Sequence, residues 1–93
     1  MSVKWLRKAL QNLAQAHAYI AKDDPTAAVR TMSTIQQAVA QLAEFPNMGR
    51  IGRVEGTREL VIPSTPYFVV YRVKGNTVQI LRVLHSARRY PDG

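Results

Sequence analysis

The first half of the chain carries apolar residues at helical spacing. After Val3–Trp5, which can form a short first strand, apolar residues recur at intervals of four and three and predict a helix from Leu6 to about Lys22. This stripe consists of Leu6, Leu10, Leu13 and Ile20, with Ala9 and Ala16 beside it and His17 in the same spacing. Because His17 falls within the stripe, we expect a packed, hydrogen-bonded histidine and not a catalytic one.

A second helix follows a clear start signal. Asp24 can cap the helix, and Pro25 suits its first position, where no N–H is needed. The apolar positions that follow, again at 4-3-4-3 spacing, are Ala28, Met32, Ile35, Val39 and Leu42. Phe45 precedes a proline and is pushed out of the α region, which ends the helix. The short connection predicts an antiparallel helical hairpin over residues 6–44.

The second half has the pattern of short strands. Strands are expected at Arg58–Ile62, Phe68–Val73 and Thr77–His85, with turns at Pro63–Pro66 and Gly75–Asn76. Successive strands joined by short turns favour an antiparallel meander over about residues 57–85. The predicted fold class is α+β: an antiparallel helical hairpin packed on a small, mainly antiparallel sheet, in a single domain of residues 1–93 whose basic tail is 86–93.

Alternation along the last strand assigns its side chains to two faces. Val78, Ile80, Arg82 and Leu84 are expected on one face, and Leu81, Val83 and His85 on the other. The loop around Gly75 has two or three residues, and its length decides which residue lies opposite Arg82.

Composition narrows the chemistry. At 93 residues and 46% hydrophobic, the chain can bury one core. The absence of cysteine excludes disulfides, thiolate metal sites and cysteine nucleophiles. His17 and His85 are 68 positions apart with no spaced carboxylates, so no metal and no cofactor are expected. Without a signal-peptide run or a membrane-length apolar stretch, we expect a cytoplasmic protein with no membrane partner.

Positive charge is concentrated in the second half. The net charge is +7, of which residues 46–93 carry eight basic and three acidic groups, a net of +5, and residues 1–45 a net of +2. Seven of those eight basic residues are arginines, whose planar fork suits phosphates and carboxylates. This pattern indicates a surface for nucleic acid or for an acidic protein, or charge that serves solubility alone.

Six motifs of the chain occur in an order that is typical of a known protein family. They are Trp5, DDPTAA at 23–28, FPNMGRIG at 45–52, GTRELV at 56–61, PYFVVYR at 66–72 and VLHSAR at 83–88. The glycines of the 49–56 loop do not form a phosphate-binding loop, because the G-K-[ST] ending is missing. In this order and spacing the chain resembles the ParE/RelE superfamily of bacterial type II toxins, specifically its ParE-like branch.

The resemblance implies a function and partners. ParE-like toxins act on DNA gyrase and stabilise plasmids, whereas RelE-like toxins cleave mRNA in the ribosomal A site. RelE-like sequences carry an arginine where this chain has Phe68, and a phenylalanine cannot neutralise a phosphate, which favours the gyrase branch. The family also implies a cognate antitoxin that wraps the toxin beside the hairpin stripes and pairs acidic side chains with its arginines.

The candidate residues for target binding are mostly basic. They are Arg50, Arg53, Arg58, Arg82, His85, Arg88, Arg89 and Tyr90. In the alternative of a ribosome-dependent mRNA endonuclease, His85 would be the acid or base, Arg82 would hold phosphate, and Tyr90 would stack a base or donate a proton. In the other interpretation His85 simply finishes a strand and the tail is a binding surface. A third hypothesis, a nucleic-acid-binding module without toxicity, predicts strongly salt-dependent binding.

Overall fold

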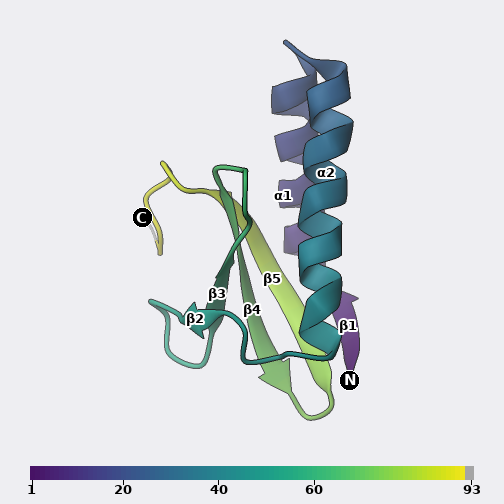
Figure 1. Ribbon diagram of the computed structural model, residues 1–93. Helices are drawn as coiled ribbons and strands as arrows, with labels where there is room; N and C mark the ends of the chain where they lie inside the picture. Colours follow the sequence, from purple (N-terminus) through teal and green to yellow (C-terminus); the bar gives the residue numbers. More distant parts are fainter. Residues whose placement is uncertain (92–93) are drawn as a thin grey trace.

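A computed structural model, which describes residues 1–91, shows two long helices lying against a five-stranded sheet (Figure 1). The elements are β1 (Ser2–Trp5), α1 (Arg7–Ala21), α2 (Pro25–Ala40), the 3₁₀ turn η1 (Gln41–Ala43), β2 (Arg50–Ile51), β3 (Arg58–Val61), β4 (Tyr67–Lys74) and β5 (Thr77–His85). The predicted fold class, a helical hairpin on a mainly antiparallel sheet, is confirmed. Within residues 1–91 no helix has the length and apolar character that crossing a membrane requires.

The strands lie in the order β1-β5-β4-β3-β2. Neighbours are antiparallel except β1, which runs parallel to β5, and the chain between them passes through both helices and strands β2 to β4. Because β1 ends at Trp5, opposite Ile80, the stretch of β5 from Leu81 to His85 pairs with β4 alone among the described strands. The two-residue strand β2 lies in the glycine-rich loop, outside the expected sheet range.

Helix α2 forms as predicted. The Asp24 carboxylate accepts the backbone N–H of Ala27 at 3.0 Å, and Pro25 is the first helical residue. The buried residues of α2 and η1 are Ala28, Ile35, Val39 and Leu42, with Met32 partly buried, so the whole predicted stripe faces inward.

Helix α1 packs through most of the predicted stripe, since Ala9, Leu13, Ala16 and Ile20 belong to the core or pack against it, but two members of the stripe point outward. Leu10 is half exposed and His17 is exposed, so the expectation of a packed His17 is wrong. The buried residues are Ala9, Asn12 and Ala16. Since α1 packs against both α2 and β5, the small side chains of Ala9 and Ala16 allow a close approach, while Leu13 and Ile20 pack beside them.

A bulge changes the faces of β5. Tyr71 lies opposite Ile80, but its neighbour Val70 lies opposite Arg82, so Leu81 is an extra residue in β5. The Gly75–Asn76 loop has two residues, because Lys74 pairs directly with Thr77.

The assignment of Leu84 to the face of Val78 and Ile80 is therefore wrong. Val78, Ile80 and Val83 belong to the main core, which lies between the helices and the sheet. Leu84 joins Phe68 and Val70 in a second, smaller cluster, onto which Leu81 and Tyr90 pack. Side chains on the helix-covered face are called inner below, and those of the second cluster are called outer.

Candidate target-binding surfaces

A buried carboxylate organises the arginines of the glycine-rich loop. Glu59 is 1% exposed, and its carboxylate pairs with Arg53 at 2.8 Å and Arg50 at 3.1 Å. It also accepts the Arg53 backbone N–H at 2.9 Å. Burial alone would raise the pKa of Glu59, but the hydrogen bonds from Arg53 and Arg50 together outweigh burial and lower it to about 2. Glu59 is thus ionised at neutral pH and holds both arginines in place.

Arg53 contacts two aromatic rings on the outer face. Its guanidinium carbon is 5.1 Å from the ring centre of Phe68 and 5.2 Å from that of Tyr90. The two rings meet edge to face, with centres 5.9 Å apart, and Arg53 donates to the Tyr90 carbonyl at 3.3 Å. Burial raises the pKa of Tyr90. These contacts hold the basic tail against the sheet.

Arg58 and Tyr71 fix the backbone of the loop that follows the helices. Arg58 donates to the carbonyl of Gly49 at 2.7 Å. The Tyr71 hydroxyl accepts the Gly49 N–H at 2.9 Å and donates to the Pro46 carbonyl at 2.7 Å. A Cβ on Gly49 would lie 2.8 Å from the Tyr71 ring, so this close approach requires glycine. The candidate Arg58 therefore supports the loop from within.

Arg82 is also bound to an internal partner. The Asn12 amide oxygen accepts Arg82 Nε–H at 2.9 Å and the Val83 backbone N–H at 3.1 Å. Asn12 thereby accepts a backbone hydrogen bond from the part of β5 that β1 does not reach. The sequence offered a weak signal for this role, a lone asparagine beside the apolar stripe of α1.

His85 lies on the inner side, away from Tyr90. Its ring meets Tyr67 edge to face at 5.3 Å, and its Nδ1 accepts the Ala87 N–H at 3.0 Å. Together with Arg88 it borders a hollow of about 460 Å³ between α1 and the end of β5. Tyr67 belongs to the inner core, whereas Tyr90 packs on the outer cluster. The structure therefore separates His85 from Tyr90.

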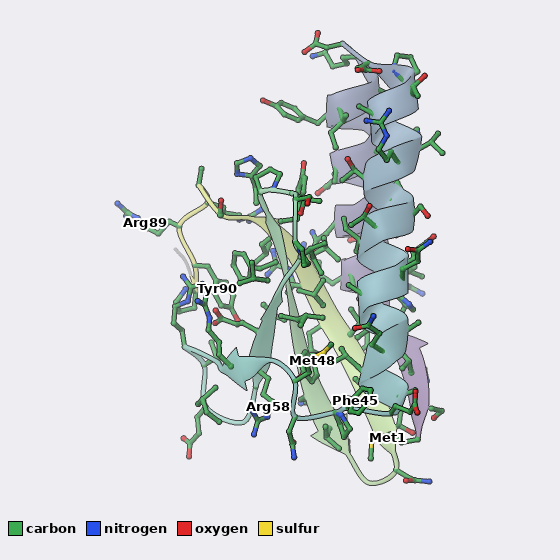
Figure 2. The ribbon with its side chains drawn as sticks, viewed as in Figure 1. Met1, Phe45, Met48, Arg58, Arg89 and Tyr90 are labelled. Carbon is green, nitrogen blue, oxygen red and sulfur yellow. The ribbon has the colours of Figure 1, made fainter. Side chains whose placement is uncertain are left out.

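Arg88 and Arg89 are exposed in the tail. The Arg89 side chain projects away from the sheet, near the docked ring of Tyr90 (Figure 2). Across residues 1–91, no cluster of three histidine, aspartate or glutamate side chains is placed to hold a metal ion. Of the eight candidates, Arg50, Arg53 and Tyr90 gather around Glu59, and Arg82, His85 and Arg88 lie beside α1. Arg58 and Arg89 belong to neither group.

Comparison with known proteins defines the class. A family model described as "ParE toxin of type II toxin-antitoxin system, parDE" matches residues 3–90. The chain belongs to this family and is a type II toxin.

Individual relatives agree with this assignment. The chain is 45% identical over 90 residues to the "Putative toxin Y4kP" of Sinorhizobium fredii, covering 97% of this chain and 93% of the relative. It is 37% identical over 86 residues to "Toxin RelE2" of Caulobacter vibrioides, covering 92% and 96%.

Solved structures share the fold. A structure titled "Chromosomal ParDE TA system from P. aeruginosa" matches with a TM-score of 0.87 at 33% identity, covering 91% of this chain and 95% of that one. The toxin–antitoxin complex RelBE2 of Mycobacterium tuberculosis matches with a TM-score of 0.63 at 26% identity, covering 90% and 95%.

Proposed function

We propose that this toxin inhibits DNA gyrase by protein–protein contact and is neutralised by a cognate antitoxin. The chain belongs to the ParE family. The gyrase target is what the resemblance to the ParE-like branch of the ParE/RelE superfamily implies. The observation that carries the choice is the separation of His85 from Tyr90 on the two sides of the sheet.

RNA cleavage needs several groups at one place. A base must reach the 2′-hydroxyl while a cation stabilises the charge that develops on the phosphate. In this chain Arg82 is bound to Asn12, Arg53 to Glu59, and an aromatic ring occupies position 68. Cations held by internal partners suit a rigid binding surface better than a phosphate site.

The titles of the matched structures support the proposal of an antitoxin partner. Their titles name a ParDE system and a RelBE2 toxin–antitoxin complex. The large hydrophobic residues Leu10, Tyr19 and Val29 remain exposed on the helical hairpin, and the chain is strongly basic. A partner segment with apolar and acidic side chains would cover both features.

Substitutions separate inhibition by contact from catalysis. His85→Ala should change growth arrest less than threefold, whereas Arg88→Ala/Arg89→Ala should weaken it at least tenfold, because these exposed cations remain available to an acidic target. Arg7→Ala/Lys8→Ala removes the same charge from an exposed part of α1 and is the matched control. If His85→Ala abolished arrest in a folded protein, the contact mechanism would be wrong.

A ribosome-dependent mRNA endonuclease is the second candidate. The observation in its favour is that relatives from Caulobacter vibrioides carry RelE names and that the RelBE2 fold matches. It predicts that the free protein cleaves mRNA on programmed ribosomes and that His85 or Tyr90 substitutions stop cleavage while antitoxin binding persists.

A further inference from the structure

The loop after α2 exposes its apolar side chains, and polar side chains of the sheet bind its backbone from inside. Phe45 is 58% exposed and Ile51 is 74% exposed, and Met48 between them is exposed as well. The groups that fix the loop backbone are the Tyr71 hydroxyl and the Arg58 guanidinium. Surface loops usually have the opposite polarity, so this arrangement calls for an explanation.

The exposed apolar residues of this region line three hollows that share residues with one another. Phe45 and Met48 border one hollow of about 810 Å³, and Met48 also borders a second hollow with Val61, which is 54% exposed. A third hollow shares Asn47 with the first and contains Ile51 and Val73. We call this surface the loop patch; its members are Phe45, Met48, Ile51, Val61 and Val73.

Most of the loop patch lies apart from the arginine tail, and only Val61 also borders a hollow with Arg53 and Phe68, which contact Tyr90. Figure 2 shows Phe45 and Met48 near the lower end of the helical hairpin and Arg58 below the sheet, whereas Tyr90 and Arg89 lie to the left, on the side of the tail. Arg58 and Arg72 border the third hollow beside Ile51. Phenylalanine, methionine and arginine are enriched at the centres of protein interfaces. A complementary surface would be apolar with an acidic rim.

The geometry points to the loop patch as a second surface, besides the exposed tail arginines, by which the free toxin contacts its protein target, whose matching surface is apolar and rimmed by carboxylates. This inference rests on the proposed function, in which the target is a protein. The loop is held by hydrogen bonds within the chain itself, so its shape needs no partner. A toxin acts after its antitoxin has left, and a preformed surface lowers the ordering cost of the next contact.

The test compares Phe45→Ser/Ile51→Ser with Val29→Ser, which removes a 64% exposed apolar side chain from α2. Ile51→Ser alone serves if the double variant does not fold. Three quantities are measured: growth arrest at matched expression, inhibition of purified gyrase, and affinity for the antitoxin. The loop-patch variant should need at least tenfold more protein for growth arrest and for gyrase inhibition, with antitoxin affinity within twofold of wild type. Val29→Ser should match wild type in growth arrest and in gyrase inhibition.

The outcomes distinguish this inference from the proposed function. If wild type and the loop-patch variant inhibit gyrase equally, the loop patch is not a target surface, while the gyrase function stands. If wild type arrests growth without inhibiting gyrase, the gyrase function fails, and a tenfold weaker arrest by the variant still supports the loop patch. A tenfold loss of antitoxin affinity, or a wild-type dimer that the variant dissociates, would overturn the inference. If wild type affects neither growth nor gyrase, both fail.

Discussion

Replacing Glu59 with glutamine tests whether the buried carboxylate holds the glycine-rich loop and the tail on the sheet. Glutamine keeps the shape but loses the charge that Arg50 and Arg53 bind. Breaking a fully buried ion pair costs about 3–5 kcal/mol. Both arginines are about half exposed, so water recovers part of this, and we expect Glu59→Gln to lower the free energy of unfolding by about 2 kcal/mol at neutral pH.

The pH dependence of stability isolates the same carboxylate. The pKa of Glu59 is about 2 in the folded protein, below its ordinary value of 4.5, so its contribution is complete above pH 4.5 and is lost as the pH falls toward 2. For these two pKa values the linkage gives a loss of about 2.5 kcal/mol on going from neutral pH to about pH 2.5.

Urea unfolding followed through Trp5, the single tryptophan, measures both effects. Wild type should lose about 2.5 kcal/mol more than Glu59→Gln between neutral pH and about pH 2.5, because the variant has no carboxylate to protonate there. The other acidic groups are common to both proteins and cancel in the comparison. Parallel stability curves for the two proteins would refute the assignment of the low pKa to Glu59.

Four further substitutions test other parts of the account by thermal or urea unfolding. Tyr71→Phe removes the hydroxyl that joins two loop backbone groups and should cost about 1–3 kcal/mol; an unchanged midpoint would contradict that role. Gly52→Ala should destabilise by about 1–3 kcal/mol, because the added Cβ would lie 2.9 Å from the Thr57 carbonyl oxygen, and a neutral effect would show that the loop yields. Asn12→Ala should cost about 1–3 kcal/mol, because it leaves two donors of β5 without their acceptor; an unchanged midpoint would contradict that role. Asp24→Ala should cost about 1 kcal/mol through loss of the helix cap, and circular dichroism should show no other change.

Local signals predicted α2 well and α1 less well. In α2 the Asp24 cap, the following proline and the apolar spacing all agree, so the helix and its buried face could be read from the sequence. In α1 most of the predicted stripe faces inward, but Leu10 and His17 do not. Which side of the stripe is buried depends on how closely α2 and β5 approach, which is a property of the assembled fold.

The sheet departs from prediction where pairing is long-range. The first strand was predicted, but its parallel partner β5 lies some 75 positions away, and alternation within a single strand cannot indicate that pairing. The extra residue Leu81 reverses the faces beyond it, and nothing in the local apolar pattern marks the bulge. Strand β2 is only two residues long, too short for any periodic signal.

The candidate site was predicted by residue type but not by geometry. The clustered arginines were identified from the sequence, and Tyr90 with them. What the sequence could not show is that Glu59 collects Arg50 and Arg53, or that Arg53 contacts two rings, because these contacts join separate segments. Glu59 did carry one signal, a charge directly before the apolar residues of its strand, where burial requires a partner. The exposure of Phe45 and Ile51 was not predicted, because Phe45 was interpreted as the end of the helix and both as part of a family motif.

Gyrase inhibition is the central claim, and a plasmid supercoiling assay with purified gyrase, ATP and antitoxin-free protein tests it most directly. The assay is scored for lost supercoiling and for linear DNA linked to protein, with and without added antitoxin. The account predicts that folded toxin inhibits supercoiling at micromolar concentration and that antitoxin reverses the inhibition. Undiminished supercoiling in the presence of folded toxin, together with mRNA cleavage on ribosomes, would contradict it.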